Sequence, residues 1–394
     1  MALREGHEEL RAGDGAQILS EVASASHLRE GREGVRTILR AIATLEPVPV
    51  RLLASKVRLP LPVTVAVIGE LSARGITERA QNGVRLTSAG VSFVETMCGD
   101  AGHDETTGLS AVLDDLVALR PPADVTLDQA KATVGTLARR VNYLLQNDSL
   151  WGRRILFLGD DDFVSVAVAR WVEKYAGAES SGPTPTLTVV DIDERVCNGI
   201  RKAAPSVQTF VQNFRDPLPD FLQHRFDVVF TDPPYTAKGA ELFLCRAAEA
   251  VEHEGAHCFF SMGHLDPGGM RQVQAAVSAI GWVIVEWIPA FNEYEGSSVL
   301  ANVSLMAHLI ATSEIAPTLR ETYEGPLYTA DVRPVIRVYR CLGCSAEWEV
   351  GKGKRWITVE RLKEDRCPLC RSDRFLRARQ HSRTESENPG GARN

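Results

Sequence analysis

The chain has 394 residues, of which 44% are hydrophobic and 24% charged, and its formal net charge is −7. These values are ordinary for a soluble globular protein with room for two or three domains, and they disfavour a dominant nucleic-acid-binding surface. No apolar run approaches the about 20 residues that a membrane helix needs. Residues 1–12 are charged and lack the apolar core of a signal peptide, so we expect a cytoplasmic protein.

Residues 1–30 are polar, and we expect them to be flexible; residues 31–98 have the pattern of a small folded domain. Three helices are predicted at residues 35–45, 50–57 and 63–74. A β-hairpin with Asn82-Gly83 at its turn follows, and then a helix at 89–97. This order resembles a winged-helix domain. Because the third helix carries almost no basic residue, a packing or dimerisation role is favoured over DNA binding.

The segment at residues 99–150 is predicted to contain an acidic linker at 99–107, a short helix at 112–119 and a longer helix at 127–146. From Arg154 onward, short apolar runs alternate with helical spacing, which indicates parallel strands joined by crossover helices. The predicted strands are residues 154–159, 187–191, 207–211, 226–231 and 256–261, followed by an antiparallel pair at 282–288 and 303–310. Residues 151–315 are thus predicted to form an α/β, Rossmann-like domain that resembles S-adenosylmethionine-dependent methyltransferases.

The turn after the first predicted strand reads Gly159-Asp160-Asp161-Asp162. A glycine permits a tight turn from strand to helix. Nucleotide-binding turns usually carry further glycines, which let backbone amides approach a phosphate. Three carboxylates in their place suit the dipole at a helix N-terminus but repel a phosphate. The sequence therefore predicts a crevice for a ligand with positive charge.

Further acidic residues follow the other predicted strands, whose carboxyl ends meet at the ligand-binding edge of such a sheet. Asp191 ends the second strand, where an acid can accept hydrogen bonds from both ribose hydroxyls of an adenosine group. Asp193 is predicted to cap the following helix. Asp216 follows the third strand, and Glu293 and Glu295 precede the last.

Asp232-Pro233-Pro234-Tyr235 follows the fourth predicted strand. The prolines donate no hydrogen bond, so carbonyl oxygens and the carboxylate are left as acceptors that can hold an amine. Tyr235 can stack on that amine or on adenine. An isolated Asp-Pro-Pro is commonly a simple turn, but its position after this strand favours a binding role. Methyltransferases that act on amino groups carry a motif of this kind at this place.

Four of the eight cysteines form two Cys-x-x-Cys pairs, Cys341/Cys344 and Cys367/Cys370. This spacing predicts a tetrahedral structural Zn²⁺ site in a zinc-ribbon-like region at residues 316–379, since four thiolates leave no coordination position open for catalysis. The polar residues 380–394 are expected to be disordered. His264, after the fifth strand, is given little weight because a lone histidine is more often structural.

Together, the winged-helix-like N-terminus, the Gly-Asp-Asp-Asp turn and Asp232-Pro233-Pro234-Tyr235-Thr236 resemble the branched-chain polyamine synthases, also called N4-bis(aminopropyl)spermidine synthases. The resemblance covers roughly residues 30–330 and leaves the cysteine-rich region outside. It implies an aminopropyltransferase whose donor is decarboxylated S-adenosylmethionine and whose acceptor is the polyamine spermidine. It also implies a homodimer.

On this hypothesis Asp162 and Asp232 bind and deprotonate the acceptor amine. Tyr235 packs over the reacting centre. Asp160 and Asp161 hold the ammonium of the donor or cap the helix. The remaining candidates bind the substrates; they are Gly159, Asp191, Asp193 and Asp216 for the donor, and Pro233, Pro234, Glu293 and Glu295 for the acceptor.

Two other functions fit parts of the sequence. An N-methyltransferase acting on nucleic acid or protein explains the Asp-Pro-Pro-Tyr motif but not the triple aspartate, because phosphate backbones require lysine and arginine. A catalytically silent regulator explains the winged helix, but the intact Asp191 and Asp232 argue against it.

Overall fold

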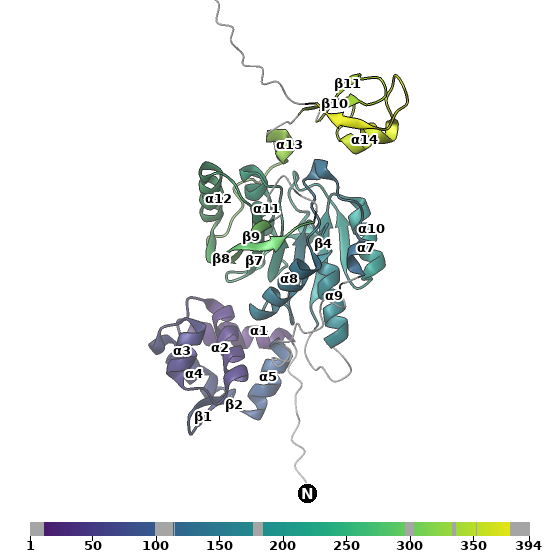
Figure 1. Ribbon diagram of the computed structural model, residues 1–394. Helices are drawn as coiled ribbons and strands as arrows, with labels where there is room; N and C mark the ends of the chain where they lie inside the picture. The colour runs from purple at the N-terminus through teal and green to yellow at the C-terminus, as the bar shows by residue number, and fades with distance from the viewer. Residues whose placement is uncertain are drawn as a thin grey trace, which may run out of the picture. The chain divides into compact units, whose positions relative to one another are not determined.

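The computed structural model describes residues 12–98, 113, 115–175, 184–295, 303–332, 336–351 and 353–378. The chain divides into two compact units, Met1–Val125 with Gln129–Gly325, and Thr126–Asp128 with Pro326–Asn394 (Figure 1). The predicted linker at 99–107 and the predicted disordered tail at 380–394 lie outside the described residues.

The first unit begins with a group of helices and a hairpin, in the predicted order. Its elements are α1 (Ala12–Ala25), α2 (Gly31–Leu45), α3 (Val50–Val57), α4 (Leu61–Ala73), β1 (Thr77–Ala80), β2 (Gly83–Leu86) and α5 (Ser88–Cys98). Helix α1 lies in the segment that was predicted to be flexible, so that prediction is wrong for residues 12–25. The helix is ordered by packing, since Leu19 and Val22 are buried in the same core as Ile38 of α2.

No single described helix is long and apolar enough to cross a membrane. One bent pair, α3 with α4 at 110°, meets the length and composition criteria when its two members are taken together.

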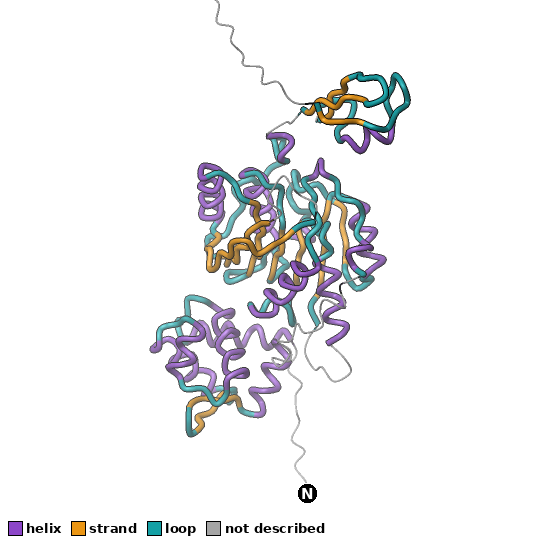
Figure 2. Tube along the Cα trace, in the orientation of Figure 1, coloured by secondary structure: helices purple, strands orange, loops and turns teal. Residues whose placement is uncertain are grey.

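A seven-stranded sheet in the order β5-β4-β3-β6-β7-β9-β8 forms the centre of the first unit (orange strands in Figure 2). Five strands are parallel, and β9 runs antiparallel to both β7 and β8. The strands are β3 (Arg154–Leu158), β4 (Thr186–Asp191), β5 (Gln208–Val211), β6 (Val228–Thr231), β7 (His257–Gly263), β8 (Trp282–Glu293) and β9 (Val303–Ala311). The predicted α/β fold with a mostly parallel sheet is therefore confirmed.

Helices cover both faces of this sheet (Figure 1). They are α8 (Val134–Gln146), α9 (Val164–Tyr175), α10 (Glu194–Ala203), α11 (Ala237–Ala250) and α12 (Pro267–Ile280). The chain also contains the shorter segments α7 (Leu116–Leu119), η1 (Val125–Leu127) and η2 (Asp220–Leu222). Ile155 and Phe157 belong to one hydrophobic core, whereas Leu156 and Leu158 belong to the other. Because successive strand residues face opposite sides, a strand covered on both faces must be apolar throughout.

Helix α8 begins at Val134, seven residues later than the predicted start at residue 127. Thr133 caps the helix by accepting a hydrogen bond from the backbone N–H of Thr136 at 3.1 Å. Just before the cap, Ala132 forms an isolated antiparallel bridge with Tyr294. Residues 125–127 form the short 3-10 helix η1 and residues 129–131 have no regular structure, so the residues predicted to be the first turns of the helix do not belong to it.

The second unit contains a small three-stranded antiparallel sheet, in the order β11-β10-β12. Its elements are α13 (Thr329–Val332), β10 (Arg337–Cys341), β11 (Glu347–Val350), α14 (Val359–Asp365) and β12 (Phe375–Arg377). Val350, Trp356 and Leu362 form its buried core.

Within the first unit, a buried network of charges joins helix α2 to the loop before β3. Asp148 pairs with Arg36, Arg40 and Arg153, and Arg153 also pairs with Glu33 at 2.7 Å. Burial opposes the charge on Asp148, but the three surrounding guanidinium groups hold the pKa of that carboxyl well below its ordinary value. The same balance lowers the pKa of Glu33 to about 2, with Arg153 as its main partner.

Asp148→Asn is expected to lower the free energy of unfolding by about 3–5 kcal/mol, because it leaves buried arginines without their counter-charge. Urea denaturation at pH 7 measures this loss. Asp115→Asn is the matched control, since Asp115 also pairs with an arginine at 2.6 Å but its side chain is 69% exposed. An exposed pair contributes about 1 kcal/mol or less, so equal losses in the two variants contradict the prediction.

Comparison of wild type with Asp148→Asn also tests how the stability depends on pH. Because the pKa of Asp148 is lowered by folding, its contribution is present above the ordinary value of 3.8 and is lost as pH falls below it. Wild type is therefore expected to lose more stability between pH 5 and pH 3 than Asp148→Asn does.

Candidate active site

The turn after β3 is tied to the end of β4 by two backbone donors. Gly159 has a φ of +74°, in the left-handed region that favours glycine. Its N–H donates to the carbonyl of Val190 at 2.8 Å, and the N–H of Asp160 donates to Oδ2 of Asp191 at 2.9 Å. The first-strand turn and the carboxylate ending the second strand thus form one connected structure.

Asp160 serves as the cap of helix α9. Its carboxylate accepts hydrogen bonds from the N–H of Val164 at 2.7 Å, from the N–H of Ser165 at 3.1 Å and from the Ser165 hydroxyl. Burial raises the pKa of Asp160 to about 7, and these hydrogen bonds only partly oppose the rise. Of the two roles predicted for this residue, the structure supports the cap.

Asp191 and Asp193 have different partners. Oδ1 of Asp191 accepts from the N–H of Asp193 at 2.7 Å, and burial raises the pKa of Asp191 to about 6. Asp193 caps α10 by accepting from the N–H of Arg195 at 2.9 Å, so the predicted cap is confirmed. Hydrogen bonding to the Arg195 side chain lowers the pKa of Asp193.

Asp162 faces the protein interior and is 3% exposed. Its Oδ1 accepts from the N–H of Ala132 at 2.6 Å and from Arg120 at 3.4 Å. Its Oδ2 accepts from Arg140 at 2.7 Å. Since both oxygens already have protein donors, this geometry favours a positioning role for Asp162 over the predicted role as a base.

Arg140, on helix α8, was missed by the sequence analysis and lies at the centre of the cluster. It is 1% exposed and donates to both Asp162 and Asp232 at 2.7 Å. It also donates to Oδ1 of Asn292 at 2.8 Å and to the hydroxyl of Tyr294 at 3.1 Å. The sequence did contain a signal for Arg140. Leu137 lies three residues before it and Leu144 four residues after it, and this spacing places Arg140 on the buried face of its helix.

The two oxygens of Asp232 have different environments. Oδ2 accepts from Arg140 and from the Tyr294 hydroxyl at 2.6 Å. Oδ1 is buried and has no hydrogen-bond partner among the described residues. Burial and the nearby charge of Asp162 raise the pKa of Asp232, against the opposing effect of Arg140. One oxygen is therefore fixed, and the other remains free to accept a hydrogen bond.

Asp161 is half-buried and makes no hydrogen bond or ion pair in the part of the chain that the structure describes. Burial is the largest cause that raises its pKa well above the ordinary value, and neighbouring negative charges add to it. Those neighbours are Asp162, Asp191, Asp232 and Asp160. Asp161 is thus the carboxylate of the first turn that a cationic ligand can neutralise.

Tyr235 packs beside this cluster. Its ring meets that of Tyr294 edge-on, with centroids 6.4 Å apart, and lies against Gly263 at the end of β7. A Cβ atom on residue 263 would lie 2.2 Å from Cδ2 of Tyr235, so the close approach of this ring requires glycine. Pro233 and Pro234 are both buried before it.

The other predicted site residues are not joined to the cluster by any hydrogen bond or ion pair among the described residues. Asp216 is exposed and accepts from the Thr322 hydroxyl at 2.8 Å. The Glu293 side chain is 57% exposed and lies 3.7 Å from Arg139. Glu295 and His264 are exposed.

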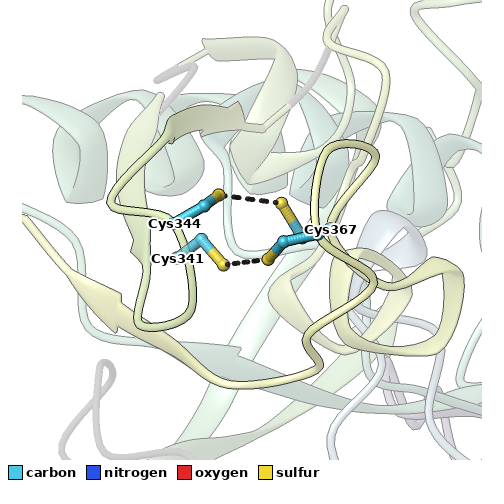
Figure 3. A group of neighbouring side chains, drawn as sticks. Cys341, Cys344 and Cys367 are labelled. Atoms are coloured by element: carbon cyan, nitrogen blue, oxygen red, sulfur yellow. Dashed lines mark hydrogen bonds between the residues drawn. The ribbon is translucent and has the colours of Figure 1, made fainter.

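The four cysteines of the second unit converge, although they come from two separate loops. The Sγ atoms of Cys341 and Cys370 are 3.5 Å apart, and those of Cys344 and Cys367 are 3.6 Å apart (Figure 3). All four sulfur atoms lie within 4.8 Å of one another. This donor set suits a tetrahedral metal ion.

The sheet and its acidic cluster define an α/β protein with several carboxylates at the carboxyl edge of its parallel strands. A family model described as the branched-chain polyamine synthase A C-terminal domain matches residues 110–350. An uncharacterised protein of Methanocaldococcus jannaschii is 34% identical over 85% of this chain and 87% of its own length. The N(4)-bis(aminopropyl)spermidine synthase of Thermococcus kodakarensis is 30% identical over 60% of this chain and 70% of its own length.

Among solved structures, this chain is similar to the branched-chain polyamine synthase of Thermus thermophilus in complex with N4-aminopropylspermidine and 5'-methylthioadenosine. The identity is 23%, the TM-score is 0.49, and the match covers 82% of this chain and 99% of that one. Because the family model spans more than half of the sequence, the chain belongs to the branched-chain polyamine synthase family.

Binding of spermidine at pH 6.5 is expected to release protons. The pKa is raised to about 7 for Asp160 and to about 6 for Asp191, and that of Asp161 is raised as well. A bound cation favours the charged form and lowers these values again, so carboxyls that are partly protonated at pH 6.5 ionise. Titration calorimetry in buffers of different ionisation enthalpy counts the released protons.

Asp161→Asn is expected to release fewer protons than wild type, whereas Asp220→Asn, which changes an exposed carboxyl outside the cluster, is expected to match wild type. Heats that do not depend on the buffer contradict the prediction.

Proposed function

We propose that this chain is an aminopropyltransferase that moves the aminopropyl group of decarboxylated S-adenosylmethionine onto an amine of spermidine and releases methylthioadenosine. Membership of the branched-chain polyamine synthase family supports this function. The observation that carries it is the group of buried and half-buried carboxylates at the carboxyl ends of β3, β4 and β6, in which Asp161 and Oδ1 of Asp232 have no partner among the described residues. Such a site suits two cationic substrates.

In the reaction, the lone pair of the acceptor nitrogen attacks the aminopropyl carbon bonded to the sulfonium. A C–N bond forms while the C–S bond breaks, and its electron pair goes to sulfur, which becomes a neutral thioether. The attacking amine is protonated at neutral pH and must first lose a proton. We assign Oδ1 of Asp232 as the acceptor of that proton. The raised pKa of this carboxyl makes it a better proton acceptor than an ordinary aspartate.

The donor is assigned to the β3–β4 side of the cluster. Asp191 accepts hydrogen bonds from the ribose hydroxyls, and Asp161 attracts the terminal ammonium. Ordinary S-adenosylmethionine carries a carboxylate next to that ammonium, which the surrounding negative charges repel. Discrimination between the two donors follows from charge, because the adenosine part is the same in both.

The remaining site residues have supporting roles in this proposal. Asp162 anchors the cluster instead of taking the proton. Tyr235 packs over the reacting centre, and the buried Pro233 and Pro234 fix the backbone that places it. Glu293 and Glu295 hold the distal amines of the acceptor, a role that their exposure allows.

The N-terminal helices and hairpin act in this proposal as a winged-helix-type module for packing or dimerisation, and the protein is a cytoplasmic homodimer. The low basic content of α4 (Leu61–Ala73) supports that role over DNA binding. The four converging sulfur atoms hold a structural Zn²⁺ in a zinc ribbon.

Incubation of the protein with decarboxylated S-adenosylmethionine and spermidine is expected to give methylthioadenosine and a polyamine heavier by one or two aminopropyl groups. Mass analysis of the products, with a panel of other polyamines alongside, measures the reaction. Asp232→Asn is expected to lower kcat by about 10²-fold or more, because an amide cannot accept the proton.

Asp227→Asn is the matched control, since Asp227 lies just before β6 and Asp232 just after it. Its loss removes an ion pair with Arg154 at 2.7 Å and is expected to lower stability while kcat stays near that of wild type. Methyl transfer from ordinary S-adenosylmethionine with no reaction of the decarboxylated donor refutes the proposed function.

Metal analysis of the purified protein is expected to find about one zinc per chain. Removal by a chelator is expected to unfold the second unit, because a structural metal contributes directly to folding. Tryptophan fluorescence reports this, since Trp356 is buried and its ring lies 5.4 Å from that of Trp348. Cys344→Ser is expected to lose the metal and Cys197→Ser, at a buried cysteine of α10, to keep it; full metal content in Cys344→Ser contradicts the assignment.

A further inference from the structure

We propose that Arg140 is the positioning residue of the reaction: it holds one oxygen of Asp232 so that the other is presented to the acceptor amine. This inference rests on the proposed aminopropyl transfer and goes beyond it, because it assigns a role to a buried cation within a site that binds cations.

The guanidinium of Arg140 is fixed by all three of its nitrogen atoms. Nε donates to Asn292 at 2.8 Å, Nη1 to Asp162 at 2.7 Å and Nη2 to Asp232 at 2.7 Å. A planar guanidinium donates in fixed directions, so three separate acceptors determine its orientation. Helix α8 thereby connects the turn after β3, the motif after β6 and the end of β8.

The acceptors of Arg140 are held in turn by their own partners. The amide of Asn292 donates to the hydroxyls of Ser261 at 3.2 Å and Ser304 at 2.9 Å, which fixes its oxygen toward the arginine. The guanidinium also lies over the ring of Phe230, 5.4 Å from its centroid. With 1% of its surface exposed and its nitrogen atoms bound to protein acceptors, Arg140 is held in the interior.

The consequence for Asp232 is that its two oxygens become unequal. Oδ2 accepts from Arg140 and from the Tyr294 hydroxyl at 2.6 Å, and two donors on one oxygen fix the plane of the carboxylate. Oδ1 then has a defined position, buried and without a partner among the described residues. Such prior placement of a proton acceptor contributes to rate, since a misplacement of about 1 Å can cost about 10²-fold.

The second consequence is electrostatic. Burial and Asp162 favour the neutral form of Asp232, and Arg140 is the largest opposing influence. Without that cation the pKa of Asp232 rises further, so a larger fraction of the carboxyl is already protonated before the amine binds and cannot act as a base. Arg120 does not replace Arg140 in this respect, since it donates to Asp162 and to the carbonyl of Ala132.

Arg140→Gln tests both consequences, and Arg140→Lys separates them. In Arg140→Gln, kcat is expected to fall by about 10²-fold, and the acidic limb of the pH profile of kcat/KM is expected to move to higher pH. Arg140→Lys retains the charge but cannot donate to three acceptors in the same geometry. Its acidic limb is expected to return toward that of wild type, while kcat recovers only in part.

Arg154→Gln is the matched control, because Arg154 also pairs with two carboxylates but at the opposite end of β3. It is expected to lose stability and to keep the wild-type pH profile. The inference is overturned if Arg140→Gln and Arg140→Lys are equally impaired and neither moves the acidic limb, which is the result of a purely structural role.

A second measurement keeps this test separate from that of the proposed function. The pKa of Asp232 is followed by carbon NMR of aspartate-labelled protein without substrate, with Asp232→Asn providing the assignment. A higher pKa of Asp232 in Arg140→Gln than in wild type is expected, and an unchanged value refutes the inference even if the enzyme is active. Absence of aminopropyl transfer in wild type refutes the proposed function and leaves this titration interpretable.

Discussion

The organisation of the ligand edge depends on the pairing of Arg140 with Asp162 and Asp232. Carboxylates from the ends of different strands repel one another when they are buried together, and a buried charge without a partner is costly. Arg140, on helix α8, reduces that repulsion by pairing with both Asp162 and Asp232. Several carboxylates can therefore lie together at this edge of the sheet, because the positive charge of Arg140 balances part of their negative charge.

The sheet was predictable because its strands are covered on both faces. Continuous apolar runs such as residues 155–158 arise where alternate side chains enter two different cores, and the predicted strands fall within a few residues of the observed ones. The start of α8 could not be predicted in the same way. It depends on the bridge between Ala132 and Tyr294, two residues far apart in the sequence.

The candidate site was predictable as a location and less so as a set of roles. The position of Asp191 and Asp232 after their strands follows from topology alone. Asp160 accepts from the start of helix α9, only four residues on, and such a cap was one of the two predicted roles. Asp162 instead accepts from Arg140, 22 residues earlier, and this partner is not visible in the spacing of the three acids. Arg140 itself had a local signal, an arginine on the buried face of a helix, which becomes meaningful only beside the carboxylates it contacts.

The raised pKa values of the cluster give a physical reason to expect that it binds cations. Burial makes the charged form of Asp161 and Asp191 costly, so these carboxyls bind protons readily when no cation is near. A positively charged substrate removes that cost by supplying the missing counter-charge, whereas a neutral ligand leaves it in place and an anionic one increases it. In the proposed function, selectivity for polyamines and for a donor without a carboxylate follows from this same burial of carboxyl groups.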